Sequence, residues 1–390
     1  MDFSKFHEYL ESLGARYGLP GYACIAMQDH QVIFRQVYGT KDHARSIPLV
    51  GNELFDVYSA TKVVTMTAVM QLVEQGKLDL EQEVANFIPE FADTPVLDHY
   101  DISAFPYPKP DFHGPVHKRK NPIRLRHLMT MTAGLSYDLD NGFLTPLAKA
   151  NADTQTIVRA IAKMPLLFEP GEHYRYSLGH DVMAAVVELV SGEKFEEYLQ
   201  NHIFTPLRLT DMYLHPGPAE LPRMMEKFQF RGDGQSMAHF PMENVFRMGN
   251  RYDCGGAGLA CTAEDYAVFL DALACGGVGR NGARILRPET IARMTVPQLN
   301  EQQEREFGRG KLGYNYGLGV RTLIYPEKSR SPEGEFGWDG AAGAFALVDP
   351  KNHISLFFAP EVMSMPQLYF DVHPVIRDTF YQCLQGDAKA

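Results

Sequence analysis

Strand-like segments at both ends of the chain, with helical segments between them, restrict the folds that this sequence can adopt. Five apolar segments bounded by turn residues predict strands: residues 21–27, 32–39, 316–321, 344–348 and 354–358. Between them, from residue 123 to about residue 210, apolar residues recur at helical spacing. This order predicts an α/β (α+β) fold in which both chain ends build one antiparallel sheet, flanked by helices, with a mostly helical region inserted.

We therefore expect two structural units. Residues 1–75 and 250–390 would form the sheet domain, and residues 76–249 would form the mostly helical domain. Clefts between packed units are common ligand sites, so the active site is expected between the two. At the N-terminus, residues 1–18 predict an amphipathic helix that ends at Gly14.

Composition excludes several classes of function. The chain has 390 residues, and its 48 acidic against 37 basic residues give a net charge of -11, which argues against a nucleic-acid surface. Neither a leader-like start nor a run of 18 apolar residues occurs, so we expect a soluble cytoplasmic protein without a membrane partner. Residues 95–121, rich in Pro and His, predict a long surface loop.

No cofactor or metal is expected. The five cysteines are odd in number and sparse, which is typical of free thiols, and their spacing fits no zinc pattern. The glycine-rich segment 255–259 lacks the Lys-Ser/Thr ending of a phosphate-binding loop, so a nucleotide site there is not expected.

Residues 55–64 have the pattern of a nucleophile site. An extended apolar approach breaks into a helix at Ser59, and Lys62 follows one helical turn later, where its amine can reach the hydroxyl. A hydroxyl alone is a poor nucleophile, and a partly desolvated amine can serve as its base. A second S-x-x-K begins at Ser191, but it follows an apolar helix and includes Gly192, so it predicts a helix end.

Four further stretches accompany Ser59-Ala60-Thr61-Lys62 in a fixed order: residues 129–135, 168–182, 255–266 and 336–343. With them, residues 15 to 385 resemble the serine-active β-lactamase and penicillin-binding-protein superfamily. The likeness is closer to class C β-lactamases and the family VIII carboxylesterases. It implies the β-lactamase/transpeptidase-like fold, and Ser59 as an acylated nucleophile with Lys62 as its amine partner.

The resemblance also implies roles at two further positions. Tyr176 matches the tyrosine that shuttles the proton and activates the deacylating water. The oxyanion hole would consist of the backbone N–H groups of Ser59 and Ala341, which stabilise developing charge by several kcal/mol.

Two departures from the lactamase pattern concern substrate binding. Leu178 stands where lactamases have an asparagine that contacts the substrate amide, and Trp338 stands where a Lys or His helps to hold the substrate carboxylate. Trp338-x-Gly340 is similar to the esterase branch, although glycine is more usual at the position of Asp339. If Asp339 faces the cleft, like charges about 4 Å apart cost an anionic substrate about 4 kcal/mol at an effective dielectric near 20.

These features favour a serine carboxylesterase acting on small neutral esters through an acyl-enzyme. Alternatives within the same fold are a β-lactamase, a D-Ala carboxypeptidase or aminopeptidase-type amide hydrolase, and an acyltransferase. A non-catalytic relative that binds or assembles is disfavoured by the intact Ser59, Lys62 and Tyr176.

Overall fold

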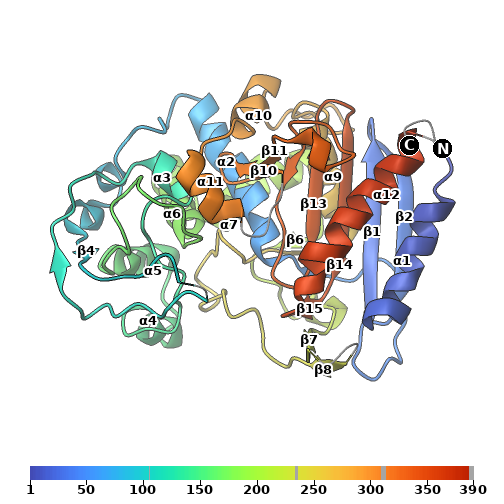
Figure 1. Cartoon of the computed structure of the whole chain (residues 1–390), viewed down its shortest axis with the longest axis horizontal. Coiled ribbons are helices and arrows are strands. Elements are labelled where there is room, and N and C mark those ends of the chain that lie inside the picture. The colour runs from blue at the N-terminus through green and yellow to red at the C-terminus, as the bar shows by residue number, and fades with distance from the viewer. Residues whose placement is uncertain (105, 233–235, 309–312, 386–390) are drawn as a thin grey trace.

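The sheet is built from both ends of the chain, as the sequence predicts. The computed structural model describes residues 1–104, 106–232, 236–308 and 313–385. Seven antiparallel strands lie in the order β10-β11-β12-β13-β14-β1-β2. Their bounds are β1 Gly21–Gln28, β2 Gln31–Gly39, β10 Tyr314–Tyr316, β11 Arg321–Leu323, β12 Phe336–Gly337, β13 Phe345–Asp349 and β14 Ile354–Pro360. Because β1 pairs with β14, the chain ends meet in the sheet (Figure 1).

Helices cover both faces of the sheet. The first helix α1 (Ser4–Tyr17) and the last helix α12 (His373–Gln385) pack against each other on one face (Figure 1). Their contact includes the rings of Phe6 and Phe380, whose centroids lie 5.5 Å apart. Helix α9 (Ala263–Ala274) packs against β1, β13 and β14. Thr262 caps it by accepting a hydrogen bond from the Asp265 amide.

The segment between the strands is mainly helical. Its helices are α3 Leu125–Met129, α4 Thr145–Lys149, α5 Thr154–Ile161, α6 Gly179–Ser191, α7 Phe195–Leu199 and α8 Thr205–Leu207, and α10 Pro288–Met294 and α11 Glu301–Phe307 follow α9. The long helix α2 (Thr61–Glu74) packs against α6 and is buried on all sides from Thr61 to Leu72. A helix buried all round belongs to the interior of a large domain.

Short strands join the remaining segments. One three-stranded sheet has the order β3 (Phe55–Asp56), β9 (Ala260–Cys261), β6 (Met212–Tyr213). Another has the order β15 (Val362–Met363), β7 (Phe228–Phe230), β8 (Met237–His239). Strands β4 (Val96–Leu97) and β5 (Val116–His117) pair at the two ends of the predicted surface loop. Among the described residues, no helix is long and apolar enough to span a membrane.

Two predicted boundaries are wrong, and both involve glycine. Helix α1 continues through Gly14 and ends at Gly18, which adopts φ 72°. Gly14 instead permits close packing, because a Cβ there would lie 2.6 Å from the Tyr38 hydroxyl. Residues 316–321 are two strands rather than one. The chain turns between β10 and β11, where the Gly317 amide donates to the Val320 carbonyl and Gly319 has φ 76°.

Candidate active site

The nucleophile turn connects β3 to α2 through a 3-10 turn at Tyr58–Ala60. The Val57 amide donates to the Leu259 carbonyl, which anchors the turn. Tyr58 adopts φ 44°, an uncommon conformation for a bulky residue that signals local strain. Its ring is buried and meets Phe246 edge-on. Ser59 is therefore held half-buried at the start of the helical segment, as its sequence predicts.

Lys62 lies one turn into the helix and is fully buried. Its Nζ donates to the Gly256 carbonyl oxygen at 2.7 Å and lies 3.4 Å from Ser59 Oγ. The same nitrogen lies 4.6 Å from the Tyr176 ring centroid. Among the described residues, no carboxylate forms an ion pair with Lys62, so its surroundings are a carbonyl, a hydroxyl and aromatic faces.

Tyr176 lies between Lys62 and Trp338. The Trp338 indole N–H donates to the Tyr176 hydroxyl oxygen at 3.1 Å, and the two rings stack with their centroids 5.8 Å apart. Trp338 is only 7% exposed because Tyr316 and Phe307 also pack around it. The indole therefore orients the tyrosine and offers little open surface of its own.

A buried carboxylate, Asp181, contacts the same glycine, Gly256, whose carbonyl accepts the hydrogen bond from Lys62. Asp181, in the first turn of α6, accepts hydrogen bonds from the Tyr252 hydroxyl at 2.6 Å and from the Gly256 amide at 3.3 Å. A Cβ on Gly256 would lie 2.5 Å from this carboxylate. The glycine-rich segment thus lets the backbone approach Asp181 while its carbonyl faces Lys62.

Two aromatic residues in this site were not identified from the sequence. The Tyr137 ring lies edge-on to Tyr176, with centroids 5.1 Å apart, and 5.6 Å from Lys62 Nζ. Burial raises the pKa of Tyr137 well above its ordinary value. Phe246 packs against the Tyr137 ring. The position of Tyr137, two residues after the family landmark 129–135, was a usable signal, whereas Phe246 lies in a loop without one.

Of the two predicted oxyanion residues, Ser59 lies in the nucleophile turn and Ala341 lies on the turn between β12 and β13. Among the described residues, neither the Ser59 nor the Ala341 amide donates a hydrogen bond within the protein. A Cβ on Gly340 would lie 2.3 Å from the Val57 carbonyl oxygen, so only glycine lets this turn approach the nucleophile turn. The Tyr369 hydroxyl lies 2.8 Å from the carbonyl oxygens of both Gly340 and Ala341.

The structure places two of the expected substrate-binding side chains, Leu178 and Asp339, in buried positions. Leu178 is 2% exposed and stands at the N-terminus of α6, where its apolar side chain joins the core. Asp339 does not present a free negative charge, because its carboxylate accepts a hydrogen bond from the Arg321 guanidinium at 2.7 Å. Both partners are buried, so the repulsion of anions expected from Asp339 has no basis.

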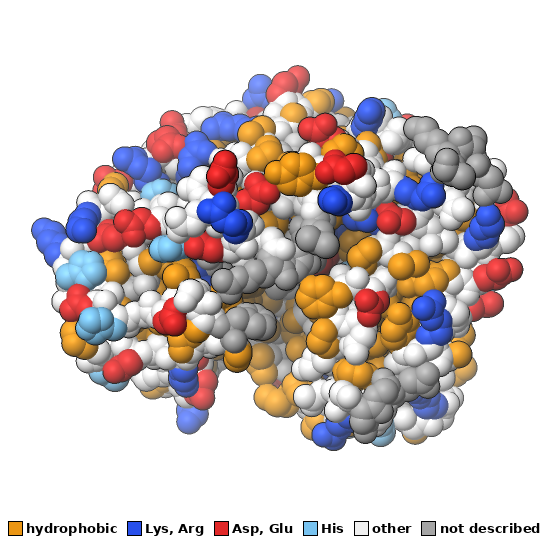
Figure 2. All heavy atoms as spheres, viewed as in Figure 1, with side chains coloured by type: hydrophobic (Ala, Val, Ile, Leu, Met, Phe, Trp, Pro, Cys, Tyr) orange, Lys and Arg blue, Asp and Glu red, His pale blue; other side chains and the backbone are white. Residues whose placement is uncertain are grey.

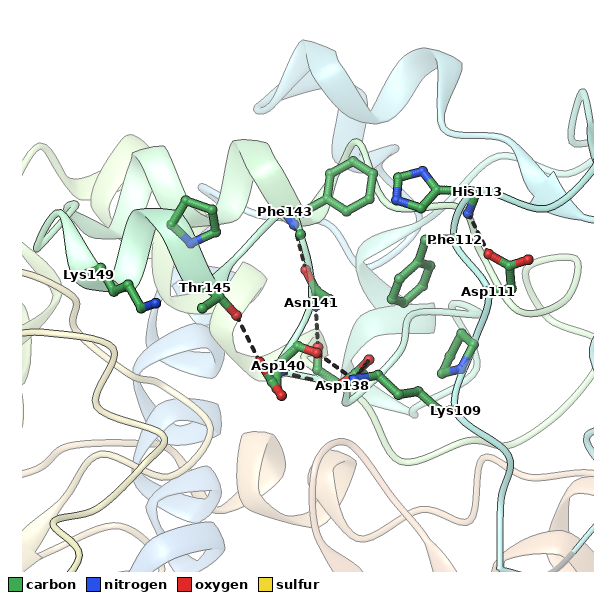
Figure 3. Close-up of a pocket in the computed structure, with 13 residues that line it drawn as sticks. Lys109, Asp111, Phe112, His113, Asp138, Asp140, Asn141, Phe143, Thr145 and Lys149 are labelled. Carbon is green, nitrogen blue, oxygen red and sulfur yellow. Dashed lines mark hydrogen bonds and ion pairs between the residues drawn. The ribbon is translucent and has the colours of Figure 1, made fainter.

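Within the part of the chain that the structure describes, possible metal ligands gather in two places: His30, Asp271 and Cys275, and Glu196, His215 and Asp253. In both, the histidine ring already hydrogen bonds to a carboxylate, at 2.7 and 2.8 Å. A cavity of about 710 Å³ lies between residues 109–113 and 138–149 (Figure 3). Phe112 and Phe143 meet edge-on there, and none of the residues expected to carry the chemistry lines it.

The sheet, the buried helix behind Ser59 and the turn bearing Ala341 together have the architecture of the serine β-lactamase and penicillin-binding-protein fold. The β-lactamase family matches residues 6–369, and the chain belongs to this family. The resemblance and fold class predicted from the sequence are thus confirmed.

The chain is similar to several named proteins, among them an esterase and an acyltransferase. Protein Rv1367c of Mycobacterium tuberculosis (strain ATCC 25618 / H37Rv) is 26% identical over 90% of this chain and 88% of that protein. Esterase EstB of Burkholderia gladioli is 27% identical over 89% of this chain and 88% of that protein. Acyltransferase calJ of Penicillium decumbens is 27% identical over 80% of this chain and 77% of that protein.

A solved structure shares the fold. EstCE1, a hydrolase with promiscuous acyltransferase activity, superposes with a TM-score of 0.75 at 23% identity. The match covers 97% of each chain.

Proposed function

We propose that this protein is a serine carboxylesterase that cleaves small esters through an acyl-enzyme on Ser59. The observation that carries this proposal is the position of the Lys62 amine, buried and 3.4 Å from Ser59 Oγ, with the Tyr176 ring against it. The active site would lie in the cleft between the sheet domain, residues 1–75 and 250–390, and the helical domain, residues 76–249. Figure 2 shows that the face of the molecule seen in this view is hollowed near its centre, with hydrophobic side chains beside the hollow.

In the proposed reaction, Lys62 accepts the Ser59 proton as Oγ attacks the ester carbonyl carbon. The amides of Ser59 and Ala341 donate to the oxyanion that forms. Collapse of this intermediate breaks the bond to the alcohol, which leaves with a proton passed from Lys62 through the Tyr176 hydroxyl. Water then attacks the acyl-enzyme while Tyr176 takes its proton and passes its own to Lys62, and Lys62 returns a proton to Ser59 as the acid leaves.

Acyl transfer is a second candidate, because an alcohol can replace water in the last step without any change in the site. The likeness to acyltransferase calJ favours this possibility. β-Lactam or D-Ala peptide hydrolysis is less favoured. At the position where lactamases hold a carboxylate with a cation, this chain has the neutral and mostly buried Trp338.

Labelling with a fluorophosphonate probe, read by intact-protein mass spectrometry, tests the nucleophile. We expect Ser59→Ala to abolish labelling and turnover of p-nitrophenyl butyrate. Ser191→Ala is the matched control, because this serine begins the other S-x-x-K and its hydroxyl bonds locally at the end of α6, donating to the Val187 carbonyl and accepting from the Glu193 amide. Persistent labelling of the Ser59→Ala protein would place the nucleophile elsewhere.

A further inference from the structure

A buried ion pair adjoins the turn that carries the proposed oxyanion donor. Arg321, on β11, is 1% exposed, and Asp339, after β12, is 8% exposed. Arg321 Nη1 donates to Asp339 Oδ1 at 2.7 Å, and Nη2 donates to the Ala346 carbonyl oxygen at 2.8 Å. The guanidinium thus bonds to both strands that flank the turn, Asp339 on the incoming side and Ala346 on the outgoing side.

Asp339 is the main counter-charge of this arginine. The other carboxylate nearby, Glu335, lies 3.6 Å from Arg321 and is fully buried. Burial raises the pKa of Glu335, which favours its neutral form. A buried guanidinium requires an ionised and hydrogen-bonded partner, so Asp339 is held in one place by the strongest interaction available to it.

The same turn is fixed at other points. His373 donates its Nε2–H to the Gly343 carbonyl at 3.0 Å, and its Nδ1 lies 3.8 Å from Asp339 Oδ2. Tyr369 bonds to the carbonyls of Gly340 and Ala341. These contacts orient the peptide groups, whereas the Arg321–Asp339 pair fixes the position of the strand end itself, two residues before Ala341.

We propose that Asp339 is a positioning residue: through its ion pair with Arg321 it fixes the turn so that the Ala341 amide points to the oxyanion of the acylation and deacylation steps. This inference rests on the proposed acyl-enzyme function of Ser59. It also gives Asp339 a role that the sequence does not suggest, since the side chain acts inward on the scaffold rather than outward on the substrate.

Kinetics of Asp339→Asn and Glu335→Gln test the proposal, because both carboxylates adjoin Arg321 but only Asp339 belongs to the turn. An oxyanion donor acts on the transition state, and its loss lowers kcat by about a hundredfold to a thousandfold. For a misplaced donor we expect Asp339→Asn to lower kcat on p-nitrophenyl butyrate at least about tenfold, with KM changed less than about twofold. Glu335→Gln should retain wild-type kcat.

Hydrogen exchange of the peptide that contains residues 339–343 provides a readout independent of turnover. We expect faster exchange there in Asp339→Asn than in Glu335→Gln at equal distance below each variant's Tm. Because an unpaired buried guanidinium can prevent folding, the double variant Arg321→Met with Asp339→Asn removes the pair as a unit. It should show the same loss of kcat.

Two outcomes would overturn the inference. The first is a folded Asp339→Asn or double variant with wild-type kcat. The second is an equal kcat loss in Asp339→Asn and Glu335→Gln, which would indicate a general effect of the buried charges. Failure of the wild-type protein to form an acyl-enzyme would instead refute the proposed function. In that case the positioning role would be judged by hydrogen exchange alone. Equal exchange of residues 339–343 in Asp339→Asn and Glu335→Gln would refute it.

Discussion

The Tyr176 hydroxyl can be removed with little disturbance to packing, which makes it a direct test of the proposed proton shuttle. Its ring stacks on Trp338 and lies against Lys62, and both ring contacts remain in Tyr176→Phe. The phenol that exchanges protons is lost. We therefore expect a folded variant whose kcat on short esters falls about a hundredfold or more, the usual effect of losing a general acid-base group.

Tyr174→Phe is the matched control for this substitution. Tyr174 lies two residues earlier and packs edge-on to Phe307 and Tyr316, and its hydroxyl has no part in the proposed chemistry. Steady-state kinetics with p-nitrophenyl butyrate, together with thermal unfolding, should separate the two variants. Near-normal turnover by a folded Tyr176→Phe protein would assign Tyr176 to packing alone.

At the residue scale, the sequence predicted groups that are close along the chain and could not predict those that meet only through the fold. Ser59 and Lys62 share one helical turn, so their spacing predicts their contact. Asp339 pairs with Arg321, which lies on another strand, and no local pattern predicts such a pairing. Successive strand residues point to opposite faces, so sequence could not determine whether Trp338 or Asp339 faces the site.

Helix α3 gives a pH-dependent test at the scale of a single element. His127 Nδ1 accepts a hydrogen bond from the Arg124 amide at the helix N-terminus, which requires a neutral ring. Burial, aided by the nearby Arg124 guanidinium, lowers the pKa of His127 from its ordinary 6.5 to about 4. The unfolded chain therefore binds a proton between these values that the folded protein does not.

The sign of the effect follows from this difference. His127 contributes its full stability above about pH 6.5, and this contribution is lost as the pH falls to about 4. The loss amounts to up to about 3 kcal/mol. Glutamine at this third helical position can accept the same amide hydrogen bond without titrating. We expect His127→Gln to unfold in urea with a weaker pH dependence across this window.

Urea unfolding of wild type and His127→Gln at matched pH values isolates this residue, because all other titrating groups are shared. Parallel curves for the two proteins across the window would contradict the prediction. In such parallel curves the free energies of unfolding of the two proteins differ by the same amount at every pH, which would mean that His127 acts only through packing.

The boundaries of helices and strands are harder to predict from the sequence than the elements themselves, because a glycine can end a helix, form a turn or permit close packing. Strands β1 and β2 follow from the apolar segments 21–27 and 32–39 and the turn residues between them. Gly14 was interpreted as a helix end, yet it allows the approach of Tyr38, and Gly18 ends the helix. In residues 316–321, an apolar run concealed a turn that requires positive φ at Gly319.

At the scale of the whole molecule, the sequence predicts the sheet that both chain ends build, because strand and helix periods differ strongly between the ends and the middle. It could not predict the strand order, since pairs such as β1 with β14 join residues that are far apart in the chain. Helix α2, which follows the turn with Ser59, is buried among these distant segments, and its burial fixes the position of Lys62.

The net charge of the whole chain leads to a prediction about substrate choice. With a net charge of -11, the protein repels anions before they reach the site. Among the described residues on this strand and turn, the Arg321 charge is paired with Asp339 and Trp338 is uncharged, so neither supplies the cation that lactamases use. We expect neutral p-nitrophenyl butyrate to be cleaved with a much higher kcat/KM than the anionic β-lactam nitrocefin.

Ionic strength separates this long-range repulsion from the fit of each substrate in the site. The Debye length falls from about 30 Å at 0.01 M to about 10 Å at 0.1 M, so added salt weakens repulsion between the chain and a distant anion. We expect kcat/KM for nitrocefin to rise over this range, while that for the uncharged ester, the control, stays constant. A fall in the nitrocefin value with salt would reveal a local positive field that attracts carboxylates, and the lactamase or D-Ala peptidase alternative would then be favoured over the esterase.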